Sequence, residues 1–120
     1  MITPITRQEL QAKIESCDEF YLVETLGETC FRHSHLPGAI CLPPGATEQL
    51  APTLLPHKNA DIVLYCLDLE CVASLDAARA LEELGYTDLY EYEGGKQDWV
   101  EAGLPTEGQS HKHRKTAALK

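Results

Sequence analysis

The sequence lacks any long hydrophobic run. Its 120 residues are 43% hydrophobic, but none of the apolar runs approaches the roughly 20 residues that a membrane-spanning helix needs. The first five residues also lack a basic stretch followed by a long apolar one, so they do not match a secretory signal. We therefore expect a cytoplasmic protein without a membrane segment, built around one core, because this length suits a single domain.

A paired cysteine motif is also missing. The five cysteines stand at positions 17, 30, 41, 66 and 71, and no two of them form a Cys-x-x-Cys pair. An odd number without such pairs argues against a disulfide framework and against a structural zinc site. We predict neither a metal site nor a cofactor, and we expect His111 and His113 to be solvated residues of a tail rather than ligands.

Basic residues are scarce over most of the chain. All 19 acidic residues and six of the ten Lys and Arg residues lie in residues 1–107, so this part carries 13 more acidic than basic side chains. Such a body disfavours nucleic-acid binding, which depends on neutralising phosphates. Residues 108–120 add four basic residues and no acid. We predict a domain over 1–107 and a basic, mobile tail over 108–120.

What remains is an alternation of strand and helix patterns. The runs 20–23 and 62–65 are apolar and rich in aromatic and β-branched residues, as in strands buried on both faces of a sheet. Thr6 and Glu9 fit a capping box, with Leu10, Ile14 and Cys17 along one face of the helix that follows. The pattern predicts helices over 6–16, about 72–84 and 97–102, and a further strand over 89–92. This alternation predicts an α/β fold, with a mostly parallel sheet and helices on both faces.

Cys66 is the main candidate for chemistry. It follows the predicted strand 62–65 directly, and ligands of open α/β sheets bind beyond the carboxyl ends of the strands. Loop N–H groups and the start of the next helix would stabilise an anion there, such as a thiolate or a persulfide. The alternative is a buried cysteine that acts only as a small hydrophobic residue.

Five segments together resemble a known family. They are Val23-Glu24-Thr25-Leu26, Ser34-His35-Leu36-Pro37-Gly38-Ala39-Ile40, Ile62-Val63-Leu64-Tyr65-Cys66, Leu84-Gly85-Tyr86 and Gly94-Gly95-Lys96-Gln97-Asp98-Trp99. Their order and spacing are similar to those of rhodanese-like domains. The resemblance implies a three-layer sheet of about five strands, and a sulfurtransferase or sulfur carrier whose Cys66 takes a sulfane sulfur from a donor and passes it to a thiol or protein acceptor.

The loop after Cys66 differs from the family pattern, in which a glycine and usually an arginine follow soon after the cysteine. Here the residues are Leu67, Asp68, Leu69, Glu70, Cys71 and Val72. Two acids without a base disfavour a thiolate and repel anionic donors, so we expect poor activity with thiosulfate. Glu24 in place of the usual Asp and Leu26 in place of a common Arg reduce the positive field further. Val72 also excludes the related Cys-x5-Arg phosphatase chemistry.

A second cysteine in the loop leaves two interpretations open. Cys71 is either an inert residue at the start of a helix or a thiol that resolves an oxidised or persulfidated Cys66 as a disulfide. If the loop curls, the two Cα atoms come within the ~4.4–6.8 Å that a disulfide requires. One alternative function is therefore a redox sensor built on Cys66 and Cys71. Another is a catalytically weak module that binds or regulates a partner. The sequence does not predict the oligomeric state.

Other possible site residues are expected to be structural. The resemblance implies that His35 shapes the turn into the next strand, although His33 and His35 near Arg32 would also suit a base or a metal site. Trp99, Cys30 and Cys41 are expected to pack rather than to react.

Overall fold

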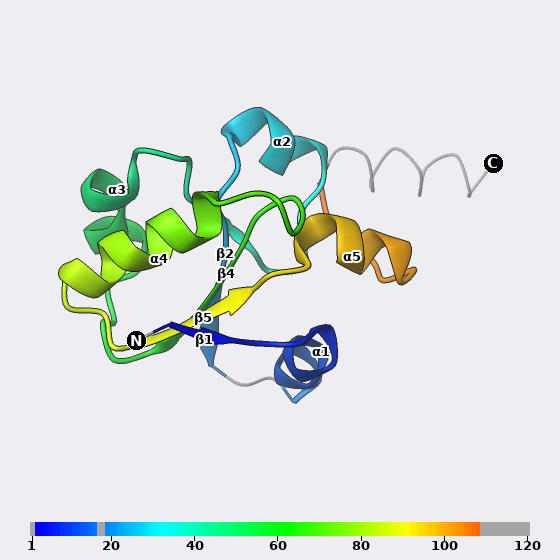
Figure 1. Ribbon diagram of the computed structural model, residues 1–120, viewed down its shortest axis with the longest axis horizontal. Helices are drawn as coiled ribbons and strands as arrows, with labels where there is room; N and C mark the ends of the chain where they lie inside the picture. The colour runs from blue at the N-terminus through cyan, green and yellow to red at the C-terminus, as the bar shows by residue number, and fades with distance from the viewer. Residues whose placement is uncertain (1, 17–18, 109–120) are drawn as a thin grey trace.

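The computed structural model describes residues 2–16 and 19–108. A five-stranded sheet lies at its centre, with strand order β1-β5-β4-β2-β3 and every pair parallel (Figure 1). The strands are β1 (Ile2–Pro4), β2 (Phe20–Glu24), β3 (Ile40–Cys41), β4 (Asp61–Tyr65) and β5 (Asp88–Tyr92). The predicted α/β class is confirmed, and the three predicted strands are the three inner ones.

Helices cover both faces of the sheet, as predicted. They are α1 (Arg7–Glu15), α2 (Glu28–His33), α3 (Thr47–Leu54), α4 (Ala73–Glu83) and α5 (Gly95–Glu101). Figure 1 shows α3 and α4 on one side of the sheet and α1 and α5 on the other, while α2 follows the end of β2. No helix among the described residues is long and apolar enough to cross a membrane.

The central strand β4 explains why its sequence is continuously apolar. Ile62 and Leu64 belong to a core beneath α3 and α4, whereas Val63 and Tyr65 belong to a second core beneath α1 and α5. All four side chains are fully buried. Successive side chains of a strand point to opposite faces, so a strand covered on both sides needs apolar residues at every position.

Local sequence signals set the start of α1. The Thr6 side chain accepts a hydrogen bond from the Glu9 backbone, and the Glu9 carboxylate accepts one from the Thr6 backbone, which completes the predicted capping box. Ile5 and Leu10 are both buried in the second core. Cys17 lies outside the described residues, so its predicted place on this helix stays a prediction.

Four short elements were absent from the sequence-based prediction. Strands β1 and β3 have three and two residues, helix α2 has no buried residue, and α3 contains Pro52. Such elements carry little periodicity, and an internal proline argues against a helix. Helix α5 also begins two residues before the predicted start, at Gly95. Beyond Gly108 the predicted tail lies outside the described residues.

Candidate active site

Cys66 lies where the sequence predicts it, directly after the last residue of β4. Because β4 is the middle strand, Cys66 is at the centre of the carboxyl edge of the sheet. Its side chain is only 2% exposed. This position provides neighbouring backbone on several sides and little direct access for water.

The loop after Cys66 turns back on itself. Its backbone N–H at Cys71 donates to the carbonyl of Asp68 over 3.3 Å, and the Asp68 carboxylate accepts from the N–H of Glu70 over 3.0 Å. This turn brings Cys71 to Cys66, and the two form a disulfide with a Cα–Cα distance of 6.1 Å. The predicted approach of the two cysteines is therefore confirmed. Helix α4 starts two residues later.

Helix α5 holds the first part of the loop. The N–H groups of Lys96 and Gln97, in its first turn, donate to the carbonyls of Cys66 and Leu67 over 2.9 and 2.8 Å. Gly95 allows this close approach, because its φ is +68° and a Cβ there would lie 2.6 Å from the Cys66 carbonyl oxygen. The Gly-Gly turn recognised in the sequence is thus the support of the cysteine loop.

A buried ion pair lies below the same edge of the sheet. The Lys96 ammonium is 3.2 Å from the carboxylate of Glu24, which is completely buried at the end of β2. The Tyr65 hydroxyl donates to this carboxylate over 2.7 Å and accepts from the N–H of Leu36 over 3.0 Å. Burial, followed by the negative charge of Glu24, raises the pKa of Tyr65 well above its usual range. The sequence analysis did not foresee this pair.

A second ion pair lies beside the other flank of the loop. Arg7 contacts the Asp98 carboxylate over 3.0 Å, and Tyr92 donates a hydrogen bond to the same carboxylate. Both Arg7 and Asp98 line a surface pocket together with Leu69 of the loop. Burial, followed by the hydrogen bond and charge of Asp98, raises the pKa of Tyr92. The start of α1 thus contacts the site, although no spacing in the sequence linked the two.

These pairs decide the electrostatics of the site. Lys96 and Arg7, the cations identified beside the loop, are each matched by a carboxylate. Among the described residues, Asp68 and Glu70 have no such cation beside them, and they line one pocket together with Glu101 and with Asp98, which Arg7 already pairs. The loop therefore presents a negative field to any approaching molecule, as the sequence indicated.

The structural roles predicted for His35 and Trp99 are confirmed. His35 Nδ1 is 2.7 Å from the carbonyl oxygen of Phe31, and the His35 ring stacks on the Phe31 ring. Trp99 is buried, and its indole N–H donates to the carbonyl of Pro105. Within residues 2–16 and 19–108, no three His, Cys, Asp or Glu side chains are grouped so as to hold a metal ion. His111 and His113 lie outside this part of the chain.

The two other described cysteines, Cys41 and Cys30, differ in how far they are buried. Cys41 is half-buried, and burial, followed by the charges of Glu24 and Glu28, raises the pKa of its thiol, which makes it a weak nucleophile. Cys30 was expected to pack, and this was wrong. It is exposed, because α2 is a short helix that buries none of its residues.

Comparison with protein families matches residues 6–102 to the rhodanese-like domain. The chain belongs to the rhodanese-like domain family. This match contains all the elements of the sheet except β1, together with the Cys66 loop. A search of curated protein sequences finds no significant relative.

Solved structures agree with the family. Thiosulfate sulfurtransferase from Pseudomonas aeruginosa is 27% identical, with a TM-score of 0.78. The matched region covers 89% of this chain but only 20% of the sulfurtransferase chain. A rhodanese from E. coli, solved with anions, is 25% identical, with a TM-score of 0.62 over 76% of this chain and all of its own. A Bacillus halodurans protein at 23% identity and a TM-score of 0.82, covering 90% of this chain and 78% of its own, shares the fold.

Proposed function

We propose that this rhodanese-like domain carries sulfane sulfur on Cys66. The thiolate of Cys66 attacks the outer sulfur of a donor persulfide. A new S–S bond forms at Cys66, the donor's S–S bond breaks, and the donor leaves as a thiolate. An acceptor thiolate then attacks the outer sulfur on Cys66, takes it, and the Cys66 thiolate leaves. The observation that carries the proposal is the position of Cys66 at the centre of the carboxyl edge, in a rhodanese-like domain that is similar in structure to a thiosulfate sulfurtransferase.

The surroundings of Cys66 support an anionic sulfur in two ways. Helix α4 begins just after the loop, so its positive end lies on the side of the cysteine pair. The carbonyls of Cys66 and Leu67 accept hydrogen bonds from the backbone of α5, which neutralises part of their negative charge and holds the loop in one shape. Because the disulfide blocks Cys66, a thiol must first reduce it.

Mass spectrometry of the reduced protein tests the proposal. The variant Cys71→Ser is used, because it cannot close the Cys66–Cys71 disulfide. After its incubation with a small-molecule persulfide, we expect one added sulfur atom on the peptide that contains Cys66, and none when Cys66→Ser is added to the same variant. Cys30→Ser, which removes an exposed free cysteine, is the matched control and should load normally. An added sulfur that persists in Cys66→Ser would overturn the assignment.

The disulfide supports a second, related function for Cys71. We propose that the Cys71 thiolate attacks the inner sulfur of a Cys66 persulfide, so that the Cys66–Cys71 bond forms and hydrosulfide leaves with the electron pair. Two thiols then reduce the disulfide and close the cycle. In the cytoplasm, the location we propose, such a bond is expected to be transient rather than structural. The same pair would let the module respond to oxidants.

Sulfide release from the loaded protein tests this step. An intramolecular thiol acts at an effective concentration of roughly millimolar, so at micromolar protein the persulfide of Cys71→Ser should last at least about ten times longer than that of the natural protein. Cys41→Ser is the control and should leave the lifetime unchanged. Equal lifetimes in Cys71→Ser and the natural protein would leave Cys71 without a resolving role.

A further inference from the structure

The cysteine loop concentrates exposed hydrophobic side chains. Among the described residues, four large hydrophobic residues are exposed, and three of them belong to this loop: Leu67 at 46%, Leu69 at 78% and Val72 at 64%. The fourth is Val100 in α5, at 50%. Apolar side chains gathered at one place on a surface mark a site of interaction with another molecule. Here they alternate with Asp68 and Glu70, so whatever contacts them also faces negative charge.

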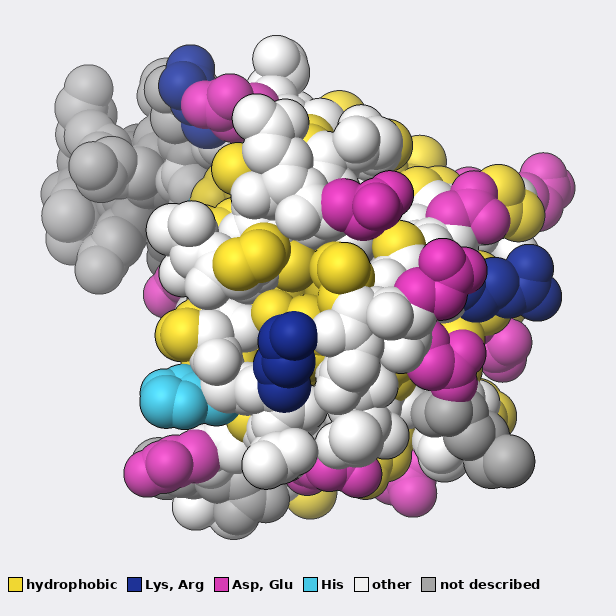
Figure 2. All heavy atoms as spheres, turned by 90° about the vertical axis from the view of Figure 1, so that its left-hand side faces the viewer, with side chains coloured by type: hydrophobic (Ala, Val, Ile, Leu, Met, Phe, Trp, Pro, Cys, Tyr) yellow, Lys and Arg dark blue, Asp and Glu magenta, His cyan; other side chains and the backbone are white. Residues whose placement is uncertain are grey.

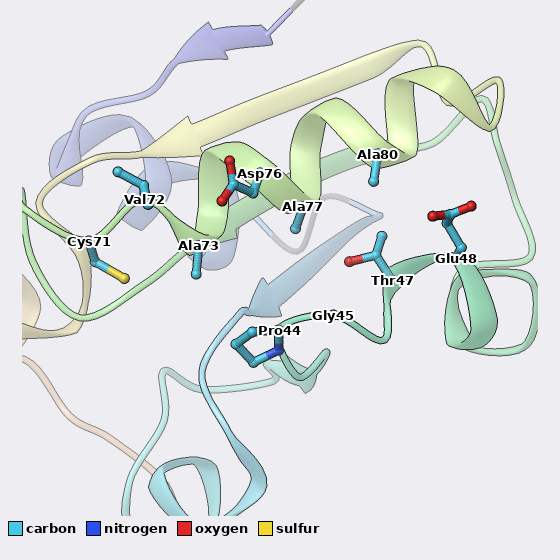
Figure 3. A pocket seen from close by; sticks show the side chains of 10 residues that line it. All are labelled: Pro44, Gly45, Thr47, Glu48, Cys71, Val72, Ala73, Asp76, Ala77 and Ala80. Atoms are coloured by element: carbon cyan, nitrogen blue, oxygen red, sulfur yellow. The ribbon is translucent and has the colours of Figure 1, made fainter.

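A groove continues from Cys71 along α4. Its volume is about 490 Å³, and its walls come from the segment after β3, from the start of α3 and from α4. Figure 3 shows the side chains of Ala73, Ala77 and Ala80 projecting from α4 towards this segment, with Cys71 at one end of the row. Glu48 and Asp76 also line the groove. The row of alanines makes part of the groove apolar, while Asp76 of α4 and Glu48 of α3 add acids to its lining.

Acids lie on both flanks of the cysteine pair. On one flank, Glu48 and Asp76 line the groove. On the face drawn in Figure 2, hydrophobic atoms reach the surface beneath a basic side chain, and acidic side chains gather mainly to one side of them. On the other side of the loop, Glu101 lines a pocket with Asp68 and Glu70, while Asp98 in the same pocket is already paired with Arg7. Acids on both sides of the cysteine pair attract a positively charged partner and repel an anionic one.

The two sulfurs of the pair differ in accessibility. Cys66 is 2% exposed, whereas Cys71 is half-buried and opens on the groove. A thiolate that approaches along the groove therefore reaches the Cys71 sulfur first. Its attack forms a mixed disulfide with Cys71, breaks the Cys66–Cys71 bond and releases Cys66 as a thiolate. A second thiol then frees Cys71.

We propose that the loop and groove are a docking surface for a protein that presents a cysteine on a basic segment flanked by apolar residues. The apolar loop residues pack against the flanking residues, and the acids on both sides pair with the bases. This inference deepens the proposed function, on which it rests for the sulfur-transfer step, by naming a protein thiol as the substrate class. The exchange at Cys71 does not require persulfide chemistry.

Cysteine peptides serve as the probe. Two synthetic peptides share one cysteine flanked by leucines and differ only in carrying lysines or glutamates. The rate at which each peptide reduces the Cys66–Cys71 disulfide is measured and divided by the rate at which the same peptide reduces a small neutral disulfide. This ratio corrects for the reactivity of the peptide's thiol. We expect the lysine peptide to be faster by at least about tenfold at low salt, with the advantage shrinking as ionic strength rises.

Variants of the loop show whether the docking surface causes this preference. Asp68→Asn with Glu70→Gln should reduce the charge preference, and Leu67→Ser with Leu69→Ser should slow the lysine peptide. The matched controls are Glu15→Gln with Glu83→Gln, two exposed acids at the ends of α1 and α4, and Val100→Ser. These controls should leave both rates unchanged. If they lower the preference as much as the loop variants do, the general charge of the protein explains it and the docking surface is refuted.

Transfer of sulfur from loaded Cys66 to the same peptides separates this inference from the proposed function. Transfer that favours the lysine peptide supports both. A second outcome is sulfur transfer at equal rates to both peptides and to glutathione, with disulfide exchange that shows no preference between the peptides. This outcome overturns the docking surface but agrees with the sulfur-carrier function. Failure to load Cys66, with exchange that still prefers the lysine peptide and depends on the loop residues, refutes the sulfur carrier and keeps the docking surface.

Discussion

Asp68 has two roles in the cysteine loop that a substitution can separate. Its carboxylate oxygen accepts the N–H of Glu70 and so shapes the turn, while its charge adds to that of Glu70 beside Cys66. Asparagine retains an acceptor oxygen at the same place but carries no charge. The field of the loop can therefore be changed without removing the hydrogen bond that folds it.

Thiosulfate turnover measures this field. Asp68→Asn with Glu70→Gln should raise kcat/KM for thiosulfate by about tenfold at low ionic strength, because two negative charges no longer repel the anion. The gain should diminish in high salt. Glu15→Gln with Glu83→Gln changes the net charge equally, but at the other edge of the sheet, and should have little effect. An equal gain in the control would assign the effect to net charge rather than to the loop.

At the scale of elements, the backbone of α5 lies directly against the cysteine loop. Gly95 has a φ of +68°, and its Cα lies so close to the loop that an added Cβ would meet the Cys66 oxygen at 2.6 Å and the Leu67 carbonyl carbon at 2.9 Å. Both obstacles are backbone atoms that α5 itself holds by hydrogen bonds. The two elements cannot separate without breaking those bonds.

Gly95→Ala should therefore disturb both stability and chemistry. We expect the free energy of unfolding, measured in urea, to fall by about 1–3 kcal/mol, and persulfide loading of Cys66 to fall with it. Gly27→Ala is a matched control, since Gly27 has a φ of −66° and an added Cβ would meet no atom within 4 Å. Because Gly27 is the N-cap of the short helix α2, we expect that control to cost less than about 1 kcal/mol and to leave persulfide loading unchanged. Equal stability of the two variants would contradict the close approach.

At the scale of the whole molecule, buried tyrosines join its layers. Tyr86 donates hydrogen bonds to carbonyls of α3 and of Leu55, Tyr65 bonds to Glu24, and Tyr92 bonds to Asp98. Burial is the main cause that raises the pKa of all three hydroxyls. In the folded protein these groups stay protonated at a pH at which an unfolded chain would lose their protons.

Alkaline pH should therefore unfold the protein. Above about pH 10 the unfolded chain binds fewer protons than the folded one, so stability falls by up to roughly 1.4 kcal/mol per pH unit for each such tyrosine. Urea unfolding at several pH values, with the disulfide kept intact, measures the slope. Tyr65→Phe should lower stability near neutral pH, because a hydrogen bond to buried Glu24 is lost, but should flatten the alkaline decline. An unchanged slope would contradict this account.

Much of the fold could be predicted from the sequence, because its main signals are local. The apolar runs of β2 and β4 and the capping box of α1 each depend on neighbouring residues, whose pattern indicates the element and its burial. The place of Cys66 at the end of a strand also follows from local order. The family resemblance rested on five such segments in register, and the acidic character of the loop could be read directly from Asp68 and Glu70.

Other features depended on residues that are far apart in the chain. Lys96 and Glu24 are separated by 72 positions, and Arg7 and Asp98 by 91. Their pairing removes two positive charges from the surroundings of the loop, and only the parallel order of the strands brings the partners together. The exposure of Leu67, Leu69 and Val72 and the groove beside Cys71 are decided in the same way. Burial depends on which elements cover a residue, and this is a property of the packed molecule.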